Sequence, residues 1–120
     1  MKSTDHAANL TMPVRLADRF EDLRTAYYAR LGDDRSRLLK LRVQLGRAKS
    51  NPRGVYMDIR SVAHGMAGAA EVFEAERISM VAQSLEAAAI AALGAPGDEG
   101  GGAVKFALDS LTDLLHSFSA

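Results

Sequence analysis

The residue best suited to chemistry in this sequence is a histidine on a helix face that is otherwise lined by small residues. His64 lies in a segment, residues 60–73, whose apolar side chains recur every three or four positions and therefore predict an amphipathic helix. Since each residue advances about 100° around a helix, the imidazole points about 160° away from the apolar side, toward solvent. Gly68 follows one turn later on that outer face, and Gly65 and Ala67 flank the pair.

Two glycines within four positions are costly inside a helix, at about 1 kcal/mol each relative to alanine. A solvated helix face usually carries Lys, Glu or Gln instead. Bare backbone around an exposed imidazole therefore indicates a surface that another macromolecule approaches closely, and a neutral imidazole is a nucleophile near neutral pH. Two other interpretations stay open. His64 would be an ordinary surface residue, or the small residues, Ala69 and Ala70 among them, would mark a close helix–helix crossing.

The same segment resembles the signature of the histidine-containing phosphotransfer (Hpt) domains of two-component phosphorelays. That signature reads H-x-(L/M)-K-G, then small residues and a phenylalanine, then a run of the form (L/I)-x-x-x-A-x-x-L-E. The likeness is specific over residues 64–86 and looser over most of residues 20–90. The positions that carry it are His64, Met66, Gly68, Phe73, Ile78, Ala82, Leu85 and Glu86.

The resemblance implies a fold, a reaction and a set of residue roles. Hpt family members are four-helix bundles that pass phosphoryl groups between aspartates of receiver domains, which belong to response regulators and hybrid histidine kinases. By this resemblance His64 is the phospho-acceptor, Gly68 is the small residue that lets a receiver domain approach, and Glu86 holds the imidazole ring. The chain would be a phosphocarrier with no autonomous kinase activity and no cofactor. The other interpretation of Glu86 is a solvated surface glutamate.

Several positions depart from the family pattern. The lysine three positions after the histidine is Ala67, which removes a cation. Glu71 and Glu74 stand where glycines are common, and Glu71 would repel a phosphoryl group; Gly65 is unusual at its position. Arg60, one turn before the histidine, would restore positive charge, unless it is an ordinary surface arginine. These departures motivate an alternative function, a degenerate Hpt-like bundle that binds receiver domains without phosphotransfer.

The elements that must position His64 are all helical. The first helix is expected to continue through Gly32 and to overhang the shorter helices, and residues 1–12 are expected to form a polar, disordered tail. The sequence predicts an all-α fold, an antiparallel (up-down) four-helix bundle over residues 13–120 with an N-terminal helical extension. No segment alternates with period two, and helical spacing recurs in residues 13–48, 55–73, 76–93 and 104–118.

Composition narrows the class of protein further. The 120 residues carry a formal net charge of zero, so no basic field favours nucleic acid or an anionic membrane. The absence of cysteine excludes disulfides and thiolate metal sites, and His6 and His116 share no helical spacing with His64 for binding a metal. With no signal peptide and no run long enough to span a bilayer, a cytoplasmic protein is expected. The dimerising hairpin of a histidine kinase and a scaffold without chemistry are the remaining alternatives.

Overall fold

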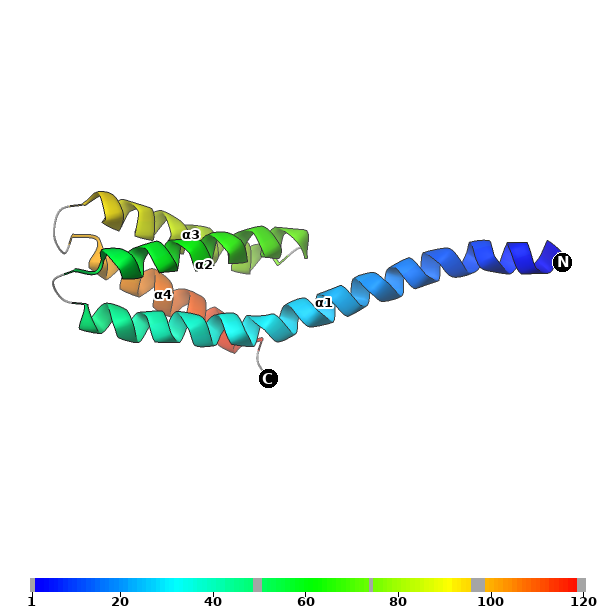
Figure 1. Cartoon of the computed structure of the whole chain (residues 1–120), viewed down its shortest axis with the longest axis horizontal. Helices are drawn as coiled ribbons and strands as arrows, with labels where there is room; N and C mark the ends of the chain where they lie inside the picture. Colours follow the sequence, from blue (N-terminus) through cyan, green and yellow to red (C-terminus); the bar gives the residue numbers. More distant parts are fainter. Residues whose placement is uncertain (1, 49–50, 74, 96–98, 119–120) are drawn as a thin grey trace.

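A computed structural model of the chain describes residues 2–48, 51–73, 75–95 and 99–118, with side chains from residue 16 onward. Within these ranges no strand occurs, and none of the helices is both long and apolar enough to cross a bilayer. The all-α class predicted from the sequence is confirmed. The helices are α1 (Lys2–Arg47), α2 (Arg53–Val72), α3 (Glu76–Gly94) and α4 (Gly101–His116), as Figure 1 shows.

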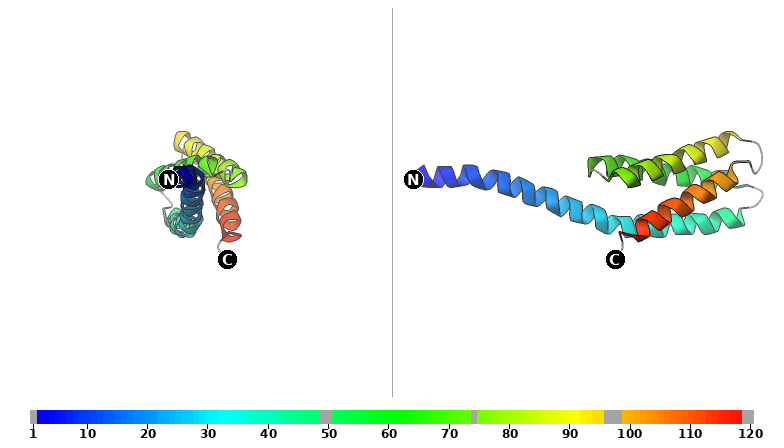
Figure 2. Two further views of the ribbon diagram at one scale, coloured as in Figure 1. Left: turned by 90° about the vertical axis from the view of Figure 1, so that its right-hand side faces the viewer. Right: turned by 180° about the vertical axis from the view of Figure 1, so that it is seen from behind.

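The four helices pack side by side around one apolar core (Figures 1 and 2). The C-terminal end of α1 lies beside the start of α2, and α2 meets α3 at the opposite end of the bundle. Pairing is most extensive between α2 and α3. Burying one large apolar side chain contributes about 1.5–3 kcal/mol, so a buried face on every helix stabilises the bundle. The largest fully buried side chains are Leu38, Ile59, Ile78, Leu85, Leu108, Leu111, Leu115 and Val104.

The longest helix, α1, extends beyond the other three at its N-terminal end (Figure 1). It is continuous through Gly32, as predicted, because Leu31 and Leu38 on either side of the glycine are both buried against the bundle. The structure differs from the disordered tail expected over residues 1–12, since α1 already begins at Lys2. That segment contains neither glycine nor proline, so no residue within it interrupts a helix.

In the connection from α3 to α4, the backbone conformation at position 100 favours glycine. Gly100 has a left-handed backbone with φ of 90°, and a Cβ at this position would lie 3.0 Å from Ala92 Cα. A residue with a side chain would therefore be strained here. α4 begins at Gly101, three residues before the predicted start, and α2 begins at Arg53 rather than at residue 55. Residues 49–50 and 96–98, which fall between the segments of helical spacing, lie outside the described residues.

Candidate functional site

The imidazole of His64 and the carboxylate of Glu86 form a hydrogen bond between two helices. His64 Nδ1 on α2 lies 2.8 Å from Glu86 Oε2 on α3. The histidine side chain is 77% exposed, whereas that of Glu86 is only 22% exposed. Because an ionised carboxylate only accepts hydrogen bonds, a neutral ring in this contact carries its proton on Nδ1. Nε2 then keeps its lone pair, and the exposed ring presents one nucleophilic nitrogen.

The packing of α2 against α3 explains why these two side chains meet. Ile59 and Ala63 are fully buried on one side of α2, which leaves His64 turned outward. On α3, Leu85 is fully buried, and Glu86 lies about 100° further round the helix, at the edge of the interface. The two side chains are 22 positions apart in sequence, and the pairing of the helices brings them into contact. The exposed histidine was predicted from the helical spacing, and its contact with Glu86 was implied by the resemblance to Hpt domains.

An open hollow of about 620 Å³ lies beside the imidazole, on the surface that α2 and α3 form together. Because both helices contribute to it, the hollow exists only while they stay paired. We refer to it as the His64 hollow. Its lining residues are His64, Ala67, Gly68, Glu71, Gln83, Glu86, Ala87 and Ile90.

Gly65 and Gly68 are not required by the packing of the chain itself. Both are exposed, and a Cβ built at either position meets no heavy atom within 4 Å. A close helix–helix crossing therefore does not account for these two glycines, although it suits Ala67 and Ala70, which are buried. The bare backbone beside His64 leaves room for a group from outside the chain.

Ala67, predicted to flank His64 and Gly68 as a docking residue, is buried in the structure. Its side chain is only 6% exposed, and its carbonyl oxygen accepts a hydrogen bond of 3.4 Å from Ser79 Oγ of α3. The prediction used only the directions of side chains around α2. In the structure, α3 covers this side of α2. Ala67 therefore belongs to the floor of the His64 hollow, and its side chain is not available as part of a docking face.

The charged side chains that line the His64 hollow are both acidic. Glu71 and Glu86 are carboxylates, and neither lysine nor arginine occurs among the described lining residues. Gln83 Nε2 donates to Ser79 Oγ at 3.0 Å and to Glu71 Oε1 at 3.5 Å. Arg60 is exposed one turn earlier on α2 and does not line the hollow. Gln83 and Ser79 were not predicted from the sequence, because their types and four-residue spacing are those of any polar helix face.

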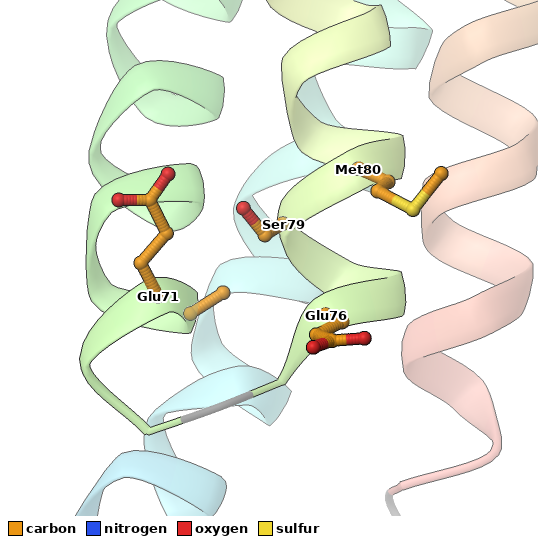
Figure 3. Close-up of a pocket in the computed structure, with 5 residues that line it drawn as sticks. Glu71, Glu76, Ser79 and Met80 are labelled. Atoms are coloured by element: carbon orange, nitrogen blue, oxygen red, sulfur yellow. The ribbon is translucent and has the colours of Figure 1, made fainter.

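A second hollow, of about 450 Å³, lies where α2 and α3 meet at the end of the bundle (Figure 3). Glu71 of α2 lines both hollows, and Glu76, Ser79 and Met80 come from α3. Among the residues that the structure describes, the lining of the second hollow includes neither a histidine nor a lysine or arginine. It therefore extends the acidic surface beside the His64 hollow without adding a nucleophile.

Metal binding finds no support in the described part of the chain. No group of three or more His, Asp or Glu side chains is placed there to hold an ion. His116 is the last residue of α4, and the side chain of His6 lies outside the described residues. Comparison of the chain with protein-family models, with curated proteins and with solved structures finds no match.

Proposed function

We propose that this chain is a cytoplasmic Hpt phosphocarrier that relays a phosphoryl group between receiver-domain aspartates through His64. The observation that supports it most directly is the 2.8 Å hydrogen bond between His64 Nδ1 and Glu86 Oε2. This bond leaves Nε2 free beside two glycines that the packing does not require. The proposal includes an antiparallel, up-down order of the helices, which short connections favour.

The reaction would be a displacement at phosphorus. His64 Nε2 attacks the phosphorus of an aspartyl phosphate, so that an N–P bond forms while the P–O bond breaks and its electron pair leaves with the aspartate carboxylate. The proton stays on Nδ1 and is donated to the Glu86 carboxylate, whose negative charge stabilises the cationic ring that N-phosphorylation creates. The receiver domain would supply the aspartate and magnesium, so the chain needs no cofactor and no kinase activity of its own.

The surface around His64 suits a protein partner better than a small molecule. The His64 hollow is open, Gly65 and Gly68 keep the nearby backbone bare, and Ile90 in its wall is 50% exposed. A net charge of zero provides no attraction for nucleic acid or an anionic membrane. The proposed partners are the receiver domains of response regulators and hybrid histidine kinases.

A second candidate function is a degenerate Hpt-like bundle that binds receiver domains without phosphotransfer. The acidic lining of the His64 hollow favours it, because Glu71 opposes an incoming phosphoryl group and none of the described lining residues is a lysine or an arginine. The buried Ala67 takes the place of the family lysine.

Phosphoryl transfer from a panel of phosphorylated receiver domains to the full chain tests both candidates. A phosphocarrier acquires acid-labile, alkali-stable label, which His64→Gln abolishes with little loss of helicity because the ring is exposed. The matched control His116→Gln keeps full labelling. Label that persists in His64→Gln would contradict the site assignment. Receiver binding by the wild-type chain without any transfer would favour the degenerate bundle.

A further inference from the structure

A polar cleft of about 130 Å³ lies between α1 and α2 and shares no lining residue with the His64 hollow. A single water molecule needs only ~10–15 Å³ of such space, so the cleft has room for a polyatomic ion. We refer to it as the α1–α2 cleft. Its polar side chains are Tyr27, Arg30, Asp34 and Arg37 of α1 and Ser61 of α2.

The hydroxyl of Tyr27 is a buried donor without an acceptor. The side chain is only 5% exposed, and its hydroxyl has no hydrogen-bond partner among the described residues. The ring is fixed by stacking on Phe73, with centroids 4.7 Å apart, and by an edge contact with Tyr28 at 5.2 Å. Burial raises the pKa of Tyr27, so the hydroxyl keeps its proton at neutral pH. A buried hydroxyl is normally paired, so this donor is open to an acceptor that enters the α1–α2 cleft.

The charges that line the α1–α2 cleft favour an anionic acceptor. Arg30, Asp34 and Arg37 follow one another at four- and three-residue steps, so they share one face of α1. Two guanidinium groups and one carboxylate leave a formal excess of one positive charge. None of the three forms an ion pair with another described residue within 4 Å. A cation would meet two guanidinium groups, and a neutral ligand would leave their charge uncompensated.

We propose that the α1–α2 cleft binds a small oxyanion, a carboxylate or a phosphate. Its oxygens accept hydrogen bonds from the Tyr27 hydroxyl and from the guanidinium groups of Arg30 and Arg37, with the Ser61 hydroxyl as a further donor. This site is independent of the proposed phosphotransfer at His64, because the two share no residue.

Titration of the full chain with inorganic phosphate and, separately, with acetate tests the proposal by NMR. Chloride at matched ionic strength is the third arm. The amide signal of Gly65 and the side-chain N–H signal of Arg37, both at the cleft, are expected to shift saturably with at least one oxyanion. The oxyanion that saturates at the lower concentration identifies the ligand class. Linear shifts equal to those with chloride would overturn the proposal.

Variants separate this site from general effects of salt. Tyr27→Phe should weaken oxyanion binding at least about tenfold, since a hydrogen bond to a charged group is lost. Its melting temperature without ligand should stay equal or rise, because an unpaired buried hydroxyl disappears. Tyr28→Phe is the matched control and should bind as the wild type does, while Arg37→Gln should bind more weakly and Asp34→Asn more tightly. Equal affinity in wild type, Tyr27→Phe and Arg37→Gln would contradict the proposed donors.

Discussion

At the scale of single residues, one acceptor decides which nitrogen of His64 can react. Glu86 accepts a hydrogen bond from the Nδ1–H of His64. A glutamine amide can either accept or donate a hydrogen bond, so it is compatible with both tautomers of the ring. We expect Glu86→Gln to lower the rate of phosphoryl transfer about tenfold or more, as loss of orienting partners commonly does. Nitrogen NMR of the imidazole should show a smaller fraction protonated at Nδ1.

The exposed Glu76 provides a control for this prediction, because it lies on the same helix as Glu86 and does not line the His64 hollow. Glu76→Gln should leave both the transfer rate and the tautomer unchanged. If Glu86→Gln also transfers at the wild-type rate, Glu86 is a surface residue whose contact with His64 has no part in the reaction.

Glu71 should disfavour the phosphorylated state of His64. At about 8 Å, with an effective dielectric of 20–80, a pair of like charges costs about 0.5–2 kcal/mol. Glu71→Gln should therefore shift the transfer equilibrium toward phosphorylated His64, by about tenfold if the cost is near 1.4 kcal/mol. The shift should shrink in high salt, because both groups are exposed. An unchanged equilibrium at low salt would mean that the Glu71 charge does not reach the phosphoryl group.

The pKa of Asp34 is raised above its ordinary value of 3.8, chiefly because burial disfavours the charged carboxylate, although Arg30 and Arg37 oppose the shift. A raised pKa means that the folded state binds this proton more tightly than the unfolded state. The resulting stability is present below pH 3.8 and is lost as pH rises through the raised value. Asp34→Asn should therefore gain stability relative to wild type as pH rises from about 3 to 7.

Urea unfolding at the two pH values measures this change in relative stability. Asp33→Asn, at the exposed neighbouring position, is the matched control for removing one carboxylate from α1. If Asp34→Asn instead loses stability relative to wild type as pH rises, attraction by Arg30 and Arg37 outweighs the cost of burial.

At the scale of the helix, two glycines should respond to alanine with opposite signs. Gly68 is exposed within α2 with open space at its Cβ position, so Gly68→Ala should stabilise the bundle by about 1 kcal/mol and raise the melting temperature by roughly 3–6 °C. Gly100 has φ of 90° and lies 3.0 Å from Ala92 at its Cβ position, so Gly100→Ala should lower the melting temperature. A fall for Gly68→Ala would show that the outer face of α2 is covered.

The helices were predictable from the spacing of apolar residues, but what covers each helix was not. The periodicity of apolar residues along α2 correctly predicted that His64 points outward, since that direction depends on one helix alone. The burial of Ala67 depends on α3 and could not be derived in that way. The contact between His64 and Glu86 was expected from the resemblance to a family. Helical spacing alone does not predict which residues of two different helices meet. The α1–α2 cleft depends on the register of α1 against α2, which no local pattern contains.

At the scale of the whole molecule, the N-terminal end of α1 extends beyond the other helices (Figure 1). Among the described side chains of α1, the first buried one is Tyr27, while Leu16 and Leu23 are 64% and 60% exposed. Phe20 contacts Phe73 of the bundle, with ring centroids 5.9 Å apart. Deleting residues 2–15 should therefore change the free energy of unfolding by less than about 0.5 kcal/mol, as measured with denaturant.

Deletion of residues 2–23 provides the comparison, because it also removes the contact between Phe20 and Phe73. This longer deletion should destabilise the bundle by about 1 kcal/mol or more. A large loss of stability on removing only residues 2–15 would show that the first turns of α1 contribute to the folded bundle.

The hydrogen bond between His64 and Glu86 also depends on the number of residues that separate them along α2 and α3. The chain leaves one helix and returns along the next within 22 positions. One residue added to either helix between the two side chains would shift one of them by about 1.5 Å and rotate it by about 100°. The carboxylate would then no longer reach the ring. A change in spacing alone would thus be expected to abolish the proposed phosphotransfer without replacing any residue of the site.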